Sequence, residues 1–239
     1  MGKRQNYKQM QDKAVQAILD HTPVNPQYIV HLDIPDGKRH IWQVDTFTVS
    51  QEESKTDKLR ALISYYGHKY ERPLRYVDPG TYKRLSCRDE VIMSNTPNEV
   101  ADHMPLIEAV EANPSTEQRI LLNGLGLGLV VEMLHKTGKV KHVTVNELSQ
   151  YVIELVEPHY KRKYGEWLQV NHSDAFGFKP PSGLKYDAVW HDIWSDITSD
   201  NLKDMKKLHA HYSRYALWQD SWCHDTCIFL SRYRSYYYR

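Results

Sequence analysis

Cysteine is scarce in this sequence, which has only Cys87, Cys223 and Cys227 among its 239 residues. Three unevenly spaced cysteines do not make a disulfide framework, and they fit a reducing intracellular compartment better than secretion. Long apolar runs are also missing. The first twenty residues hold none that is long enough for a signal peptide, and no later stretch approaches the length of a membrane span. We therefore expect a soluble, cytoplasmic protein without a membrane partner.

An excess of charge of either sign is lacking too, because 31 Lys and Arg face 30 Asp and Glu, a net charge of +1. Nucleic acid is therefore not expected as a partner, although a local basic cluster would not show in the sum. Phenylalanine is rare: there are 4 Phe and 17 Tyr. Tyrosine adds a polar tip to an apolar ring, which suits a wet cleft or an interface, and the sequence leaves a homodimer open.

The first 95 residues carry mixed helix and strand patterns. Apolar residues recur with helical spacing before Pro23, and alternating apolar residues flank a Pro-Asp-Gly turn. These patterns predict a small α+β segment over residues 1–95. Its predicted elements are a helix over 6–20, a hairpin with strands over 28–34 and 39–49 around a turn at 35–38, a helix over 51–67 and an extended stretch over 74–85.

The sequence of residues 95–99 predicts the start of a helix. Thr96 is suited to the N-cap, Pro97 to the first helical position and Glu99 to the third, which together form a capping box. Apolar residues with helical spacing follow. The sequence therefore predicts a capped helix over 97–112.

From residue 119 onward, short apolar strands alternate with helices. This alternation predicts parallel strands joined by right-handed crossovers, a Rossmann-like, mostly parallel α/β sheet with flanking helices over residues 96–239. Only some 20 residues follow the last strand, so the sheet is expected to be short at that end. The predicted strands are 119–123, 142–147, 168–171, 186–192 and 215–220, and the predicted helices are 129–136, 150–160 and 200–211.

A glycine-rich loop follows the first of these strands and opens a helix. After Asn123 come Gly124, Gly126 and Gly128, a G-x-G-x-G spacing, whereas the dinucleotide fingerprint would need glycine where this chain has Leu129. Glycine suits a tight turn that a ligand approaches closely. We expect a nucleotide-type cofactor at this loop.

An acidic residue follows each of the next three strands. Glu147 ends the second, 23 residues after Gly124, where an acid accepts hydrogen bonds from the two ribose hydroxyls of such a cofactor. Asp174 follows the third strand and Asp192 ends the fourth. The carboxyl ends of parallel strands share one edge of the sheet, where ligands bind. The three acids and the loop are therefore expected to face one cleft.

The glycine spacing resembles the first motif of class I S-adenosylmethionine-dependent methyltransferases. The resemblance implies S-adenosylmethionine as the cofactor, with the loop around its amino-acid end. It also implies that Asp174 contacts the adenine amino group and that the next backbone N–H meets the ring. The implied cofactor-binding set is Asn123, Gly124, Gly126, Gly128, Glu147, Leu148, Asp174, Ala175 and Asp192.

Residues 84–196 are more specifically similar to the spermidine-synthase-like branch of this superfamily. The likeness rests on Arg88-Asp89-Glu90, on the stretch 143–156 around Glu147 and on the strand that leads to Asp192. The β-rich start also fits that branch, and the chain resembles methyltransferase-like proteins that bacteriophages often encode. Aminopropyltransferases carry Asp-x-x-Asp-Pro at this point, whereas this chain has one more residue before Asp196 and no proline. Polyamine synthesis is therefore put in doubt.

Asp192 and His103 are the candidate catalytic residues. Asp192 would orient the acceptor or take a proton from an amine nucleophile, and His103 lies on the helix expected to border the cleft. Methylation of DNA bases is disfavoured, because no Pro-Pro-aromatic sequence follows Asp192 and no Pro-Cys pair occurs. Trp194 could stack on a planar substrate or pack over the cofactor pocket.

A metal site is not expected. Two histidines and two cysteines occur within nineteen residues, but their spacing fits no common zinc pattern. These residues are His209, His211, Cys223 and Cys227.

The sequence favours a methyltransferase acting on an unidentified acceptor, small or macromolecular. Two alternatives stay open: aminopropyl transfer from the decarboxylated cofactor, and a non-catalytic, phage-type protein that binds S-adenosylmethionine. A nicotinamide oxidoreductase is weakened by Leu129.

Overall fold

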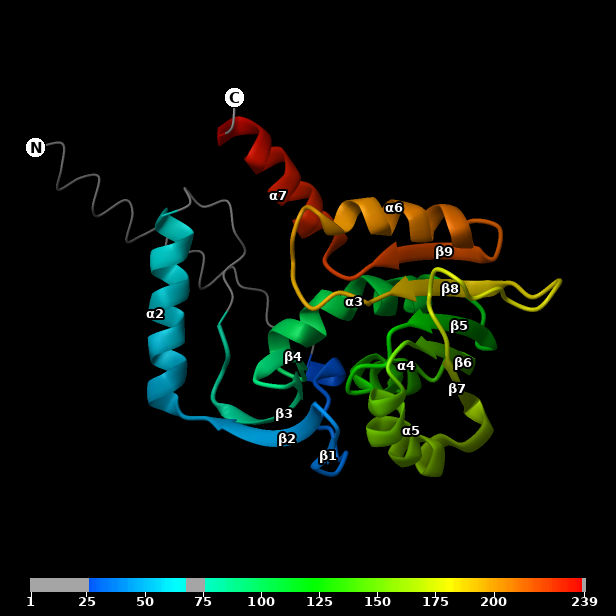
Figure 1. Cartoon of the computed structure of the whole chain (residues 1–239), viewed down its shortest axis with the longest axis horizontal. Coiled ribbons are helices and arrows are strands. Elements are labelled where there is room, and N and C mark those ends of the chain that lie inside the picture. Colours follow the sequence, from blue (N-terminus) through cyan, green and yellow to red (C-terminus); the bar gives the residue numbers. More distant parts are fainter. Residues whose placement is uncertain (1–25, 68–75, 238–239) are drawn as a thin grey trace, which may run out of the picture.

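The computed structural model describes residues 26–67 and 76–237 and contains two β-sheets (Figure 1). The first sheet is antiparallel, and α2 (Gln51–Gly67) follows its second strand, as predicted. The helix predicted over 6–20, and the start of the extended stretch predicted over 74–85, lie outside the described residues. The sheet has the order β1-β2-β3-β4, with strands β1 (Gly37–Arg39), β2 (Trp42–Val49), β3 (Gly80–Cys87) and β4 (Glu90–Ser94).

The predicted hairpin is wrong in its pairing. The strands that pair are β1 and β2, around a turn that contains His40 with a positive φ of 54°. Residues 29–36 form no strand, although they follow a short 3₁₀ turn, η1 (Pro26–Tyr28), in an alternating pattern. Alternating apolar and polar residues indicate that one face of a segment is buried. An extended segment can bury one face by packing on the core, without pairing to another strand. The buried residues are Tyr28, Val30, Leu32 and Ile34.

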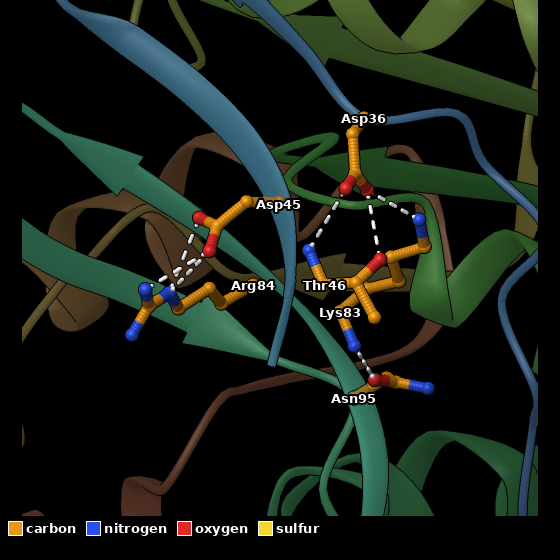
Figure 2. Close-up of polar contacts among 6 residues, drawn as sticks. All are labelled: Asp36, Asp45, Thr46, Lys83, Arg84 and Asn95. Atoms are coloured by element: carbon orange, nitrogen blue, oxygen red, sulfur yellow. Dashed lines mark hydrogen bonds and ion pairs between the residues drawn. The ribbon is translucent and has the colours of Figure 1, made fainter. Parts of the chain in front are cut away.

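Polar side chains fix this extended segment to the sheet (Figure 2). The Asp36 carboxylate accepts a hydrogen bond from the Thr46 hydroxyl at 2.9 Å and pairs with the Lys83 ammonium at 2.5 Å. The Asn95 amide donates to the Val30 carbonyl at 2.9 Å and accepts from the Lys83 backbone N–H at 2.6 Å. These contacts take the place of a strand ladder for residues 29–36.

Helix α3 (Pro97–Ala112) has the predicted bounds but not the predicted cap. Thr96 has the extended backbone of an N-cap, yet its side chain makes no capping hydrogen bond. Its hydroxyl accepts instead from the Ser94 hydroxyl at 3.1 Å. Pro97, whose missing N–H needs no partner at that position, is the sequence signal that does hold at this helix start.

The second sheet is parallel and has five strands, which confirms the predicted α/β fold with a Rossmann-like parallel sheet. The chain runs outward from β5 to β7 and then crosses to β8 and β9, so the order reverses at β5, which is where open parallel sheets bind ligands. The order is β7-β6-β5-β8-β9, with strands β5 (Gln118–Asn123), β6 (Val140–Glu147), β7 (Leu168–His172), β8 (Tyr186–His191) and β9 (Ala216–Ser221).

Helices cover both faces of this sheet. Alternate residues of β5 divide between two buried clusters: Ile120 and Leu122 pack with α3, α4 and α5, whereas Leu121 packs with α6. The last strand is followed by a helix, and no further strand follows within the described residues. The helices are α4 (Leu129–Thr137), α5 (Gln150–Tyr164), α6 (Asn201–Tyr212) and α7 (His224–Tyr237), with a short 3₁₀ turn η2 (Gly165–Trp167) after α5.

The two sheets share one hydrophobic core. Val44 and Leu85 of the antiparallel sheet belong to the same buried cluster as Ile120 and Val145 of the parallel sheet. The last antiparallel strand ends at residue 94 and α3 begins at residue 97, close to the predicted boundary at 95. The division into two domains stays a prediction. No helix among the described residues is both long and apolar enough to cross a bilayer.

Candidate functional site

A cavity of about 610 Å³ lies at the carboxyl ends of β5, β6, β7 and β8. The loops after these four strands supply one wall, and the antiparallel sheet supplies another through Trp42, Leu85, Cys87, Glu90, Ile92 and Met93. Seven of the predicted site residues line the cavity: Gly124, Gly126, Glu147, Leu148, Asp174, Ala175 and Asp192. Three do not line it: Asn123, Gly128 and His103.

Protein atoms, rather than a ligand, already require each glycine of the loop. Gly124, Gly126 and Gly128 have positive φ values of 107°, 51° and 76°. A Cβ at Gly124 would lie 1.9 Å from the Asp192 carbonyl oxygen, and a Cβ at Gly128 would lie 2.2 Å from the Tyr160 ring. The positive φ values agree with the tight turn predicted at these glycines, and Gly128 in addition makes room for the Tyr160 ring.

Glu147 is held at the end of β6 by two backbone donors. One carboxylate oxygen accepts from the N–H of Leu125 in the glycine loop at 2.9 Å, and the other accepts from the N–H of Ser149 at 2.8 Å. A carboxylate oxygen has two lone pairs, so each keeps capacity for one further donor. Glu147 thus joins two loops of the cavity and can still bind a pair of ligand hydroxyls.

The loops after β6, β7 and β8 expose apolar side chains at the cavity. Leu148 is 69% exposed, and Phe176 and Ile193 are also exposed, yet all three line the same cavity. Asp174 accepts a hydrogen bond from the Phe176 N–H at 2.9 Å, an Asx turn that shapes the second of these loops. Exposed apolar side chains that converge on one cavity suit a flat, apolar ligand group.

Asp192 lies at the end of β8, with its side chain 20% exposed. Burial raises the pKa of its carboxyl well above the usual value, and the negative charges of Glu99, Asp102 and Glu147 raise it further. Its backbone N–H donates to the Asn123 carbonyl at 2.8 Å, which fixes the start of its loop to β5. Asp192 is therefore a more basic carboxylate than a solvated one and is placed at the cavity wall.

His103 lies behind Asp192, on α3. It is completely buried, its Nε2 is 3.8 Å from the Asp192 carboxylate, and neither ring nitrogen has a hydrogen-bond partner among the described residues. Burial lowers the pKa of His103 to about 3, so the ring is neutral at physiological pH. A distance of 3.8 Å is longer than a hydrogen bond, so the two groups are neighbours and not yet a hydrogen-bonded pair.

The charged residues that line the cavity are all acidic. Among the described residues of the lining there is no Lys, Arg or His. Glu90 and Glu99 were not predicted as site residues: α3 was expected to border the cleft, but the approach of β4 to it depends on the packing of the two sheets. The lining acids are Glu90, Glu99, Glu147, Asp174 and Asp192.

The antiparallel sheet contributes residues that no local sequence pattern marks as functional. Met93 lines the cavity, and its sulfur accepts a hydrogen bond from the Leu127 N–H at 3.1 Å. Trp42 lines the cavity from β2, and Trp222 lines it from the segment after β9. The indole nitrogen of Trp222 is buried and has no hydrogen-bond partner among the described residues.

Of the four residues considered as zinc ligands, the two histidines make hydrogen bonds to other groups. His209 Nε2 lies 2.9 Å from the Ser221 hydroxyl, and His211 Nε2 lies 2.8 Å from the Phe178 carbonyl. One group of three potential ligands does occur among the described residues: Asp33, Glu132 and His159. The Lys163 ammonium lies 2.6 Å from Glu132 and 3.3 Å from Asp33, so a cationic side chain already balances these carboxylates.

The sequence matches no protein-family profile and no curated protein sequence. Among solved structures, coclaurine N-methyltransferase, bound to N-methylheliamine and SAH, is 18% identical, with 50% of this chain and 33% of that chain covered and a TM-score of 0.39. The N-methyltransferase NodS from Bradyrhizobium japonicum WM9 is 14% identical, with 50% and 63% covered and a TM-score of 0.39.

A third structure, the putative methylase HI0767 from Haemophilus influenzae, is 18% identical, with 50% of this chain and 65% of that chain covered and a TM-score of 0.37. The chain thus spans between 33% and 65% of the length of these three proteins. Similarity this low does not determine a shared activity, so function has to be argued from the residues of the cavity.

Proposed function

We propose that this chain binds S-adenosylmethionine in the cavity at the carboxyl ends of β5 to β8 and transfers its methyl group to an acceptor. One observation carries the proposal. The glycine loop and the acids that follow three successive strands, Glu147, Asp174 and Asp192, converge on a single cavity at the point where the strand order reverses.

The residues present fit such a cofactor. Glu147 keeps an acceptor site on each carboxylate oxygen and would hold the two ribose hydroxyls. Leu148 and Ala175 would contact the adenine, with Asp174 at its amino group, because apolar side chains and an acid meet there. The loop that contains Gly124 and Gly126 would border the amino-acid end.

Bound S-adenosylmethionine supplies a methyl carbon that is already electrophilic, because it is attached to a sulfonium. The protein then has to align the acceptor and to remove a proton from it where the acceptor carries one. Asp192 is the residue for that proton: it lines the cavity, and burial makes its carboxylate more basic than usual. His103 does not itself line the cavity and would act through its neighbour Asp192, as a positioning residue.

A second candidate is aminopropyl transfer from the decarboxylated cofactor, as in the spermidine-synthase-like branch. The acidic lining favours it, because the methionine carboxylate of the complete cofactor would find no cationic side chain among the described residues of the cavity wall. The missing proline and the extra residue before Asp196 weigh against it. Methyl transfer stays the first proposal, and the chain would then be an enzyme of the type that bacteriophages encode.

Calorimetric titration tests the proposal on the whole chain with S-adenosylmethionine, its decarboxylated form and NAD. We expect S-adenosylmethionine to bind, and binding to be lost in Glu147→Ala and weakened in Glu147→Gln. Glu117→Ala is the matched control, since Glu117 precedes β5 at the opposite end of the strand and pairs with Lys141 on the surface.

Each other outcome selects a different account. A preference for the decarboxylated form would replace methyl transfer by aminopropyl transfer. Tight binding without release of S-adenosylhomocysteine on any acceptor tested would make the chain a binding protein. Binding of NAD alone, or of none of the three ligands, would overturn the proposal.

A further inference from the structure

Two buried tyrosine hydroxyls each hold the backbone of a loop that lines the cavity. Tyr160, on α5, donates to the carbonyl of Leu127 in the glycine loop at 2.8 Å. Tyr212, the last residue of α6, donates to the carbonyl of Ala175 in the loop after β7 at 2.7 Å. Both side chains are fully buried, and neither lines the cavity, so the hydroxyls act on the loops from behind.

Both hydroxyls keep their proton and therefore remain hydrogen-bond donors. Burial is the largest cause that raises the pKa of Tyr160 and of Tyr212 far above the usual tyrosine value, so neither ionises at physiological pH. The Tyr160 ring fills the space beside Gly128, which only glycine leaves free. The Tyr212 hydroxyl also lies 3.2 Å from the Asn123 side-chain oxygen, which ties it to the middle of the sheet.

That oxygen belongs to a row of polar side chains, one from each strand of the parallel sheet. His191 is neutral, since burial lowers its pKa to about 3, and its Nδ1 lies 2.8 Å from the Asn123 amide nitrogen and accepts its hydrogen bond. Donors along the row point the same way, an arrangement in which each hydrogen bond strengthens the next. In order, the row is Asn171 to Asn146 (3.3 Å), Asn146 to Asn123 (2.9 Å), Asn123 to His191 (2.8 Å) and His191 to Gln219 (3.3 Å).

We infer that Tyr212 and Tyr160 are positioning residues that serve different halves of the ligand. Tyr212, anchored to the polar row, fixes the Ala175 peptide on the adenosine side, and Tyr160 fixes the Leu127 peptide on the amino-acid side. The inference rests on the proposed function for the assignment of the two sides, whereas the two tyrosine contacts do not depend on it.

The test compares Tyr212→Phe and Tyr160→Phe, which remove only a hydroxyl, with adenosine and S-adenosylhomocysteine as calorimetric probes. Loss of one neutral hydrogen bond that holds a binding-competent loop weakens binding by about fivefold. We expect Tyr212→Phe to weaken both probes by a similar factor. We expect Tyr160→Phe to weaken S-adenosylhomocysteine by about fivefold and adenosine by less than about twofold.

A purely structural role would not separate the two probes. Tyr186→Phe is the matched control, because Tyr186 is also buried but starts β8 at the end of the sheet away from the cavity. It should lower thermal stability without changing either affinity. Equal weakening of both probes by Tyr160→Phe, or no weakening by Tyr212→Phe, would overturn the inference.

Hydrogen exchange on the protein without ligand separates this inference from the proposed function. Tyr212→Phe should speed exchange in residues 173–178, and Tyr160→Phe should speed it in residues 124–129, each without affecting the other loop. If the wild type binds neither probe, the proposed function fails, and exchange still decides whether the tyrosines hold the loops. Unchanged exchange in both loops would refute the inference.

Discussion

Replacing Gly128 by alanine should destabilise the protein far more than replacing Gly138. The two glycines cap the opposite ends of α4, and both have positive φ, 76° and 64°. A Cβ at Gly128 would lie 2.2 Å from the Tyr160 ring, whereas a Cβ at Gly138 would meet nothing within 4 Å. Gly138→Ala is therefore a matched control for the backbone cost alone.

The magnitudes follow from these two contributions. A left-handed backbone conformation costs an L-residue about 1–2 kcal/mol, and this cost lowers the unfolding free energy of both variants. Forcing a methyl group into packed atoms costs about 1–3 kcal/mol more, and this cost applies only to Gly128→Ala. Urea unfolding should therefore show a loss of about 1–2 kcal/mol in the unfolding free energy for Gly138→Ala and about 2–5 kcal/mol for Gly128→Ala.

A double-mutant cycle identifies the cause. In a Tyr160→Leu background the ring is gone, so the extra cost of Gly128→Ala should shrink toward that of Gly138→Ala. If Gly128→Ala costs no more than Gly138→Ala, or if its cost is the same with and without Tyr160, the packing explanation of this glycine is refuted.

Two further predictions concern pH. Burial lowers the pKa of His103 and of His191 to about 3. Below about pH 6.5 the unfolded chain therefore binds protons at these two histidines, whereas the folded protein does not. Relative to neutral pH, each histidine should lower the unfolding free energy by about 2 kcal/mol at about pH 5. In urea unfolding at neutral pH and at about pH 5, we expect His103→Phe to remove its own share of this fall, about 2 kcal/mol. A fall that is unchanged in the variant would contradict the assignment. Burial and neighbouring acids raise the pKa of Asp192, so its ionised form destabilises the fold above the ordinary aspartate pKa of 3.8. Asp192→Asn should raise the melting temperature at neutral pH, with a gain that disappears as the pH falls toward 4, and a lower melting temperature at neutral pH would argue against this.

The parallel sheet was predictable because its signals are local. Its five strands and the helices α4, α5 and α6 follow apolar or periodic runs, and α3 has the predicted bounds, 97–112, whereas α7 was not predicted. Acids at the ends of successive strands could be assigned to one edge of the sheet, since parallel strands place their carboxyl ends together. The sequence therefore sufficed to bring Glu147, Asp174 and Asp192 to the same cavity.

The remaining features depend on contacts between distant residues. The alternation over 28–34 reports a buried face, and nothing in it tells whether the segment has a strand partner. The hydroxyl of Thr96 meets Ser94, where the sequence predicts a helix cap. Met93 reaches the glycine loop from a different sheet, and Gly128 is explained by a tyrosine 32 residues away along the chain. No local pattern encodes such pairs.

A crystal structure with S-adenosylhomocysteine tests the central claim most directly, because it shows both whether the ligand binds and where. We predict the ligand in the cavity at the carboxyl ends of β5 to β8, with its ribose hydroxyls on Glu147, its adenine between Leu148 and Ala175, and its amino-acid end at the loop of Gly124 and Gly126. Ligand bound elsewhere, such as in the cavity of about 500 Å³ beside α2, or no bound ligand at saturating concentration, would contradict the account.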